Sequence, residues 1–355
     1  MYSIAKSDLF DLFSRLAQNN KIFVPYEYKD RFVFGEFDPS KEANIQLGGI
    51  RQTQPFKSFL NPAREKVLGQ EGGSLKLAPY RYGAGSIIVA GVKQCDLSSL
   101  ILQDFVFLKG DIEDPFYAFH RKNTLIISND CTFAKETCFC IAMAGRPYPV
   151  KNFDLNLSSL GELFLVEVGT DKGRAIIDAY KTFFKNAQDR DLNERDRMRD
   201  NVCVQINDFI NKRGTPDTEA IKGAVKKHYD NLAMWQDFAS TCVECGACNL
   251  TCPTCHCFLL FDEKSKQQKI GRGRIWDACL YKTFARVAGG HNPRKHLYER
   301  LRNRFDKKFT FFPQVLDYAA CTGCGRCIEA CPGDIDLREV LKGLVTDKWN
   351  KPPHD

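Results

Sequence analysis

The sequence predicts a mixed α/β domain followed by an all-α region built around cysteine loops. Strand and helix patterns alternate through the first half of the chain, whereas charged helix formers dominate from about residue 189 and no strong strand pattern follows them. A cysteine spacing that begins at Cys242 is repeated from Cys321. With 355 residues, the chain is long enough for two or three domains.

The first half of the chain contains the strand and helix patterns. The expected elements are helices over 8–16 and 174–187 and strands over 21–27, 31–37, 86–92, 124–130 and 162–169. Asp96 follows one of these strands and suits the N-cap of a helix that begins near Leu97. Cys95 is then expected in the turn between strand and helix, and Cys131 directly after the next strand.

Changes in composition predict where the domains begin and end. Residues 1–185 are expected to form the α/β domain, 186–234 a helical connector, and 235–355 the all-α part. Charged helix formers fill the connector, and Gly and Pro interrupt its pattern at 212–217.

Sixteen cysteines determine which chemistry is open to the chain. The N-terminal helix pattern lacks the continuous apolar core of a signal peptide, and no apolar run reaches the roughly 18 residues needed to span a bilayer. These features predict a cytoplasmic protein with no membrane partner, in a compartment where thiols stay reduced. The cysteines are therefore expected to bind metal rather than to form a disulfide framework.

Two complete cysteine motifs give the strongest signal. Each has the spacing CxxCxxCxxxCP, in which the first three cysteines ligate one [4Fe-4S] cluster and the fourth ligates the other cluster. The ligands expected for the first cluster are Cys242, Cys245, Cys248 and Cys331. Those expected for the second are Cys321, Cys324, Cys327 and Cys252. A pair of structural zinc sites is the alternative, because CxxC pairs also bind zinc.

The residues around the cysteines refine this prediction. A long insert, 253–320, separates the two motifs, which favours a helical ferredoxin module with two [4Fe-4S] clusters over a compact bacterial ferredoxin. Gly246, Gly323 and Gly325 suit loops whose backbone adopts unusual angles close to a cluster. No nucleophile with a base, no Walker loop and no HExxH motif occurs, so the sequence offers no catalytic constellation.

The formal charge of +7 does not require a nucleic-acid partner, and none is expected. An oxidised four-iron cluster on four thiolates carries roughly −2, so three clusters would reduce the net charge to about +1. Basic residues are frequent between the two motifs and include Arg272, Arg274, Arg294, Arg300, Arg302, Arg304, Lys307 and Lys308. They offset the charge of the metal sites or, as an equal alternative, form a solvated basic face.

Three stretches carry a family resemblance: "CGACNLTCPTCHCFLLFDE", "IWDACLYKTFARVAGGHNPRKHLYERLRNRF" and "CTGCGRCIEACP". They resemble the beta subunit of cytoplasmic sulfhydrogenases and the corresponding dicluster subunit of anaerobic sulfite reductases, and the similarity extends upstream through "GVKQCDLSSL". Such proteins are iron–sulfur electron-transfer subunits. The resemblance implies a relay between a flavin- and NAD(P)-binding subunit and a catalytic subunit, either a nickel-iron hydrogenase or a sirohaem sulfite reductase.

Eight cysteines lie outside the two motifs. Four of them, at or near the ends of expected strands, suggest a third [4Fe-4S] cluster in the N-terminal domain: Cys95, Cys131, Cys138 and Cys140. Ordinary buried cysteines are the alternative, although three cysteines in ten residues are unusual for packing. Cys255, Cys257 and Cys279 either pack near a cluster, pair on oxidation, or bind a further metal with His256, and Cys203 is interpreted as structural.

The function that the sequence predicts is electron transfer within an oxidoreductase complex. Two complete cluster motifs without a catalytic constellation favour a relay subunit over an enzyme. One alternative is an enzyme that uses an N-terminal [4Fe-4S] cluster with an open iron. Another is a relay subunit of a different oxidoreductase, such as a heterodisulfide-reductase-like complex, although the sequence contains no CC pair.

Overall fold

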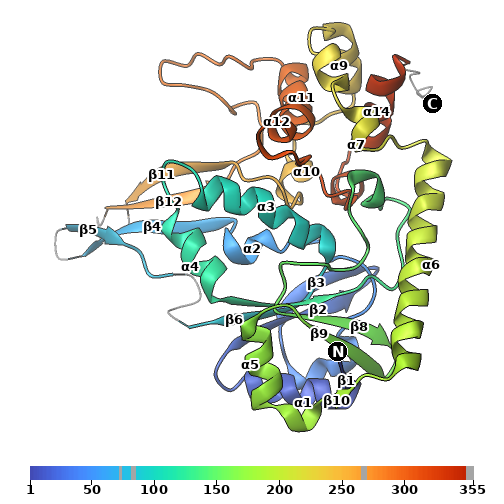
Figure 1. Ribbon diagram of the computed structural model, residues 1–355. Coiled ribbons are helices and arrows are strands. Elements are labelled where there is room, and N and C mark those ends of the chain that lie inside the picture. Colours follow the sequence, from blue (N-terminus) through green and yellow to red (C-terminus); the bar gives the residue numbers. More distant parts are fainter. Residues whose placement is uncertain (72–73, 81–84, 265–269, 349–355) are drawn as a thin grey trace. The chain divides into compact units, whose positions relative to one another are not determined.

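The computed structural model describes residues 1–71, 74–80, 85–264 and 270–348 (Figure 1). The chain divides into two compact units that alternate along the sequence. Unit 1 consists of Met1–Asn61, Pro79–Glu136 and Gly145–Ile206, and unit 2 of Pro62–Ala78, Thr137–Ala144 and Asn207–Asp355. The sequence predicts consecutive segments instead, so Pro62–Ala78 and Thr137–Ala144 are the two segments whose unit differs from the prediction.

Unit 1 is built on a sheet that has eight strands within the described residues, in the order β10-β1-β9-β8-β7-β6-β2-β3. The strands are β1 (Tyr2–Ala5), β2 (Lys21–Tyr28), β3 (Arg31–Glu36), β6 (Ile87–Val92), β7 (Thr124–Asn129), β8 (Leu155–Leu160), β9 (Leu163–Val168) and β10 (Lys185–Asn186). Strands β2, β6, β7 and β8 run parallel, and antiparallel strands complete both edges. Each strand predicted in this part of the chain is confirmed.

Helices cover both faces of this sheet (Figure 1). One face packs on α1 (Lys6–Leu16) and α5 (Asp171–Ala179), and the other on α2 (Lys57–Leu60), α3 (Gln94–Leu108) and α4 (Pro115–Asn123). Strand β6 shows why both faces are filled. Ile88 and Ala90 enter the first core, whereas Ile87 and Val89 enter the second, because successive side chains of a strand point to opposite faces.

The predicted start of helix α3 is wrong by three residues. The helix begins at Gln94 with Lys93 at its N-cap, so Cys95 lies in the first helical turn and not before it. Asp96 is fully buried, and its Oδ1 accepts a hydrogen bond from the backbone N–H of Phe56 at 3.0 Å. The carboxylate therefore binds a segment remote in sequence instead of capping its own helix.

Unit 2 is mainly helical. Its helices are α7 (Thr218–Ile221), α8 (Ala224–Lys227), α9 (Leu232–Phe238), α10 (Ala247–Leu250), α11 (Leu297–Asp306), α12 (Phe312–Leu316), α13 (Arg326–Glu329) and α14 (Leu337–Thr346). A π-helical turn η4 (Lys307–Phe311) follows α11 directly. The long helix α6 (Asp189–Arg213) lies in the predicted connector, and the division between the units falls within it. No helix among the described residues is both long and apolar enough to cross a membrane.

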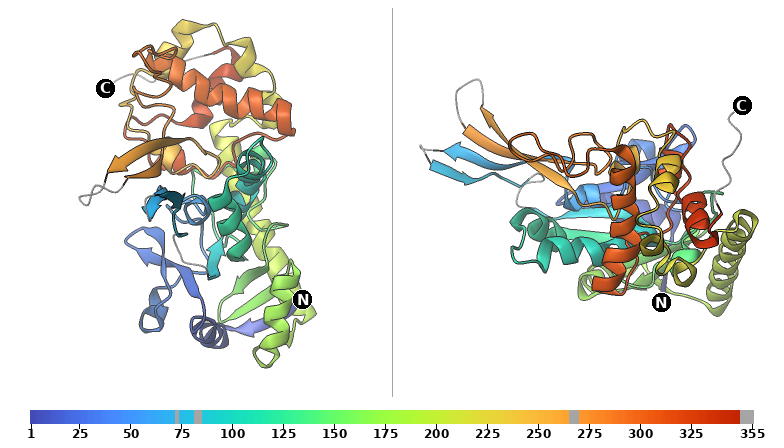
Figure 2. Two further views of the ribbon diagram at one scale, coloured as in Figure 1. Left: turned by 90° about the vertical axis from the view of Figure 1, so that its left-hand side faces the viewer. Right: turned by 90° about the horizontal axis from the view of Figure 1, so that it is seen from above.

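The prediction of an all-α module is not confirmed, because unit 2 also contains a four-stranded sheet. Its strands are β4 (Arg64–Glu71), β5 (Ser74–Leu77), β11 (Phe258–Lys264) and β12 (Ile270–Trp276), in the order β11-β12-β4-β5. Figure 2 shows the blue strands β4 and β5 beside the orange strands β11 and β12. A partner strand from a distant part of the chain completes this sheet, which a local pattern cannot reveal.

A buried ion pair joins β4 to β12. The guanidinium of Arg274 donates to Glu65 Oε2 from Nε at 3.1 Å and from Nη2 at 2.7 Å. Both side chains are almost fully buried, with exposed fractions of 2% and 3%. An exposed pair on the same sheet, Arg272 with Asp262 at 2.7 Å, provides a comparison.

We expect Glu65→Gln to destabilise the protein by on the order of 3 kcal/mol, since it removes the carboxylate charge opposite a buried guanidinium. The control Asp262→Asn breaks the exposed pair and should leave the stability almost unchanged, because solvent screens exposed charges. The midpoint of urea denaturation measures both effects. Equal shifts for the two variants would contradict the structural role given to the buried pair.

Candidate iron–sulfur sites

The two cysteine loops of unit 2 share one backbone conformation. Glu244 and Gly323 occupy equivalent positions with φ of 58° and 63°, and Gly246 and Gly325 follow with φ of 71° and 74°. A short helix then begins in each loop, α10 in the first and α13 in the second. The expectation that Gly246, Gly323 and Gly325 adopt unusual angles is confirmed, because left-handed φ values are open to glycine at little cost.

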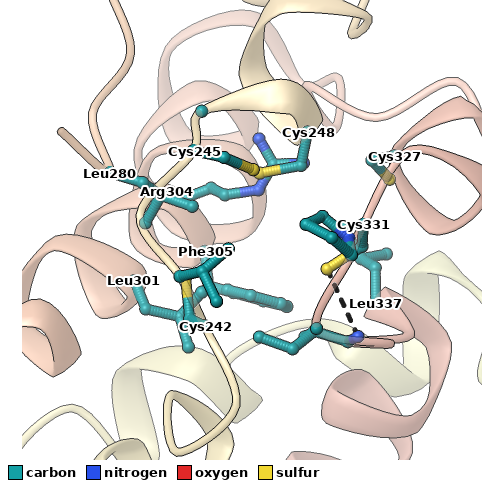
Figure 3. Close-up of a pocket in the computed structure, with 15 residues that line it drawn as sticks. Cys242, Cys245, Cys248, Leu280, Leu301, Arg304, Phe305, Cys327, Cys331 and Leu337 are labelled. Carbon is teal, nitrogen blue, oxygen red and sulfur yellow. Dashed lines mark hydrogen bonds between the residues drawn. The ribbon is translucent and has the colours of Figure 1, made fainter.

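The first cavity brings together Cys242, Cys245, Cys248 and Cys331 (Figure 3). Apolar side chains form much of the remaining wall, among them Leu280, Leu301, Phe305 and Leu337. The backbone N–H of Ile335 donates to Cys331 Sγ at 3.4 Å, the contact dashed in Figure 3. Cys245 is exposed and the other three cysteines are half-buried.

The second cavity brings together Cys252, Cys321, Cys324 and Cys327. Cys252, Cys321 and Cys324 are buried, so this cavity is more enclosed than the first. The fourth cysteine of each motif lines the cavity of the other motif, because Cys331 borders the first cavity and Cys252 the second. Cys327 borders both cavities, so the eight motif cysteines lie around two adjoining cavities, and their division into two sets of four ligands stays a prediction.

The environment changes the acidity of these thiols. Burial raises the pKa of Cys248 to about 11 and that of Cys321 to about 12. The pKa of Cys252 is instead lowered, first by a hydrogen bond with Cys255 and then by the nearby charges of Lys308 and Arg304. Buried thiols resist ionisation on their own, and iron that binds their thiolates would displace the protons.

The donor set fits [4Fe-4S] clusters. Five motif thiols border the first cavity and four the second, with Cys327 at both. Backbone N–H groups bond sulfurs of both loops, from Glu244 to Cys242 and from Gly323 to Cys321. Apolar walls and N–H···S bonds are the features by which proteins hold and tune such clusters. In the described part of the chain, no three His, Cys, Asp or Glu side chains are grouped so that they could hold a single metal ion.

A third cavity adjoins the other two and is lined by Cys255, His256, Cys257 and Cys279. The amide nitrogen Nδ2 of Asn249 lies 3.0 Å from Cys279 Sγ and 3.6 Å from Cys255 Sγ, and donates to both. Cys279 is also part of the apolar core of unit 2. These contacts agree with the interpretation that Cys255 and Cys279 pack beside the candidate cluster sites.

In unit 1, Cys95 and Cys131 lie at one edge of the sheet. Cys95 is in the first turn of α3, which follows β6, and Cys131 comes shortly after β7. These two strands are parallel neighbours, so their carboxyl ends meet at the same edge. The ammonium of Lys93 is buried there, and burial lowers its pKa, which the nearby Cys131, Asp130 and Cys95 partly offset.

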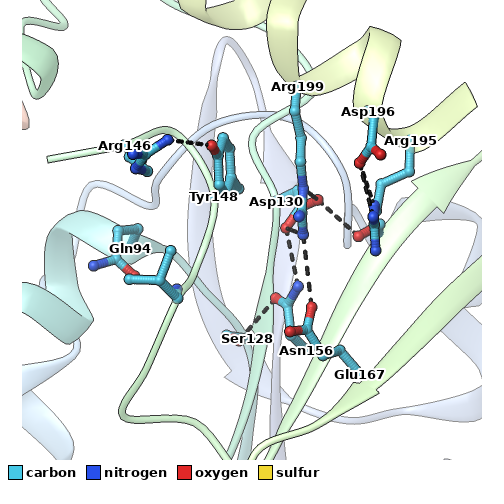
Figure 4. A network of polar contacts seen from close by, with 12 residues as sticks. Gln94, Ser128, Asp130, Arg146, Tyr148, Asn156, Glu167, Arg195, Asp196 and Arg199 are labelled. Carbon is cyan, nitrogen blue, oxygen red and sulfur yellow. Dashed lines mark hydrogen bonds and ion pairs between the residues drawn. The ribbon is translucent and has the colours of Figure 1, made fainter. Parts of the chain in front are cut away.

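A polar network supports this edge (Figure 4). The fully buried carboxylate of Asp130 accepts hydrogen bonds from Asn156 at 3.0 Å, Ser158 at 2.7 Å and Arg199 Nε at 2.7 Å. Its backbone oxygen accepts from Lys93 Nζ at 2.9 Å. Because Asp130 precedes Cys131, the network fixes the backbone at the position of this cysteine.

Cys138 and Cys140 belong to unit 2, whereas the sequence analysis predicts them in the N-terminal domain. Their segment packs on the second cysteine loop, and the backbone N–H of Phe139 donates to Gly323 O at 2.9 Å. A Cβ atom on Gly323 would lie 2.5 Å from Cys140 Cα. The close approach of two backbones, which no local sequence pattern reveals, explains this difference.

Comparison with known proteins agrees with this geometry. Residues 241–335 match the family of 4Fe-4S dicluster domains. Together with the two cavities, this match indicates a 4Fe-4S dicluster domain in unit 2.

The chain is similar to sulfhydrogenase 2 subunit beta of Pyrococcus furiosus, with 29% identity over 339 residues that cover 94% of this chain and 96% of that protein. The predicted resemblance to sulfhydrogenase beta subunits is confirmed. F420-dependent formate dehydrogenase subunit beta of Methanocaldococcus jannaschii is 20% identical over 180 residues, which cover 50% of this chain and 37% of that protein. No solved structure was found to match the chain.

The backbone contact at Gly323 leads to a test. We expect Gly323→Ala to lose about four irons per chain, one cluster, because the new methyl group would meet the backbone of Phe139 and Cys140. Gly223→Ala is the matched control, since Gly223 also has a positive φ, 79°, but no atom lies within 4 Å of its added Cβ. The control should lose about 1 kcal/mol of stability and no iron. Equal iron content in both variants would contradict the packing described.

Proposed function

We propose that the chain is the electron-transfer subunit of a cytoplasmic oxidoreductase complex. It would relay electrons between a flavin- and NAD(P)-binding subunit and a catalytic subunit. A bound [4Fe-4S] cluster supplies reversible one-electron transfer, and the chain supplies the thiolates, the apolar walls and the N–H donors that hold it. The proposal assigns one cluster to each of the first two cavities.

The observation that carries the proposal is the pair of adjacent cavities around which the eight motif cysteines lie. Cys327, Arg304 and Leu337 line both cavities, so clusters in them would be close neighbours. The more exposed first cavity, with Cys245 at the surface, suits exchange of electrons with a partner. The enclosed second cavity suits transfer within the chain.

The names of the relatives support particular partners. A sulfhydrogenase beta subunit that is similar over nearly its whole length favours a nickel-iron hydrogenase as the catalytic partner. The alternative is a sirohaem sulfite reductase, the other partner that the sequence implies. The shorter similarity to a formate dehydrogenase beta subunit favours the broader view that related chains serve different oxidoreductases.

We also propose a third [4Fe-4S] cluster with Cys95, Cys131, Cys138 and Cys140 as its ligands. Two of these cysteines lie at the carboxyl edge of neighbouring parallel strands, beside a buried lysine. The other two are separated by one residue in a segment fixed against a cysteine loop. A cluster with an open iron at this place would instead support the alternative of an enzyme.

Iron content tests the cluster assignments. The anaerobically purified chain should hold about twelve irons, and Cys245→Ser, Cys324→Ser and Cys95→Ser should each lose about four. Cys203→Ser is the control, since this half-buried cysteine of α6 should hold no iron. Fewer than about eight irons in the unaltered chain would overturn the two-cluster core of the proposal, and an intact third cluster in Cys95→Ser would remove this residue from the ligands.

Purification from the native host tests the partners. We expect a flavoprotein and a nickel-iron or sirohaem subunit to copurify without oxygen and to be identified by mass spectrometry. A chain that purifies alone and turns over a substrate with reductant would overturn the relay and favour the enzyme.

A further inference from the structure

The basic residues between the two cysteine motifs have different surroundings. Among those that the structure describes, four are buried: Arg274, Arg300, Arg304 and Lys308. The first pairs with Glu65, and the second donates to the backbone oxygens of its own region and pairs with Glu244 at 3.0 Å. The other two, Arg304 and Lys308, face cysteine sulfurs.

Lys308 lies in η4 and is about 5% exposed. Its ammonium donates to Thr254 Oγ1 at 2.7 Å, to Ala320 O at 2.8 Å and to Cys252 Sγ at 3.4 Å. The residue lines the second and third cavities but not the first. Its charge is therefore directed at a proposed ligand of the second cluster.

Arg304 lies four residues earlier, one turn away on α11, and is also about 5% exposed. It lines all three cavities, and Nη1 donates to Cys255 Sγ at 3.8 Å. Figure 3 shows its side chain on the wall of the first cavity, together with Cys248. Its charge is therefore shared between the two cluster sites.

We propose that Arg304 and Lys308 are positioning residues that raise the reduction potentials of the clusters, with Arg304 acting on both and Lys308 mainly on the second. This inference rests on the proposed function, since it requires clusters in both cavities. An oxidised cluster on four thiolates carries roughly −2 and gains a further negative charge on reduction. A fixed cation in a poorly solvated site favours the more negative state, and its effect decreases with distance.

Arg304 lines both cluster cavities and Lys308 only the second, so substitutions of the two residues should shift the two midpoint potentials differently. Lys308→Gln keeps an N–H donor but removes the charge, and should shift the midpoint potential of the second cluster to more negative values while the first changes less. Arg304→Gln should lower both potentials. Lys308→Arg and Arg304→Lys keep the charge and should stay close to the unaltered protein. EPR-monitored redox titration measures the potentials, and Cys245→Ser and Cys324→Ser assign the signals.

The matched control is Arg302→Gln. Arg302 is on α11 with the two proposed residues, but its Nη1 donates to Tyr229 O at 2.7 Å and its guanidinium stacks 4.0 Å from the Tyr229 ring. Arg302→Gln removes one positive charge, as Lys308→Gln does, and should shift the midpoint potential of neither cluster. Equal shifts from Arg302→Gln and Lys308→Gln would overturn the inference, because they would reflect only the net charge of the chain.

Iron content and the EPR signals of the reduced chain separate the failures. If the unaltered chain lacks two [4Fe-4S] signals, the proposed function fails. If both clusters are present and Lys308→Gln leaves their potentials unchanged, the inference alone fails. If Lys308→Gln loses the second cluster while Lys308→Arg retains it, a positive charge is required at this place and the inference is supported; loss in both variants overturns it.

Discussion

The structure of unit 2 depends on one constraint: eight thiols from two loops must border two adjacent cavities. To meet it, each loop turns through left-handed backbone positions and then starts a short helix, and each sends its last cysteine to the cavity of the other. The segment that contains Thr137 and Cys140 then packs against the second loop so closely that no side chain fits at the glycines of that loop. Thus Gly323 lies against the backbone of Cys140, and a β-carbon at Gly325 would lie 2.3 Å from Thr137 O.

Burial of charge is the second consequence of this arrangement. Burial raises the pKa of motif thiols such as Cys248 and Cys321, so the protein must favour their ionised form by other means. Arg304 and Lys308 supply positive charge at the walls of the cavities, from consecutive turns of α11 and η4. Their own burial is tolerable because hydrogen-bond acceptors and sulfurs surround them, as the contacts of Lys308 with Thr254 and Ala320 show.

Unit 1 follows a different principle, in which a sheet buried on both faces presents residues at its carboxyl edge. Parallel pairing of β6 and β7 places Cys95 and Cys131 at that edge. Lys93 and Asp130 fix the backbone there, because the ammonium of Lys93 donates a buried hydrogen bond to the carbonyl of Asp130 at 2.9 Å. A rigid edge of this kind would suit the proposed third cluster, whose ligands must hold their geometry as an electron enters and leaves.

The sequence by itself determined features that depend on neighbouring residues: helix α6, the glycine-bearing loops and five strands of unit 1, namely β2, β3, β6, β7 and β9. Each follows from spacing or from backbone preference within a few positions. Only the tertiary structure decided that β11 and β12 join a sheet with β4, that Cys138 and Cys140 pack with unit 2, and which basic residues are buried. Arg274 forms its ion pair with Glu65, which is 209 residues away in the sequence, and a local pattern cannot predict a contact at that separation.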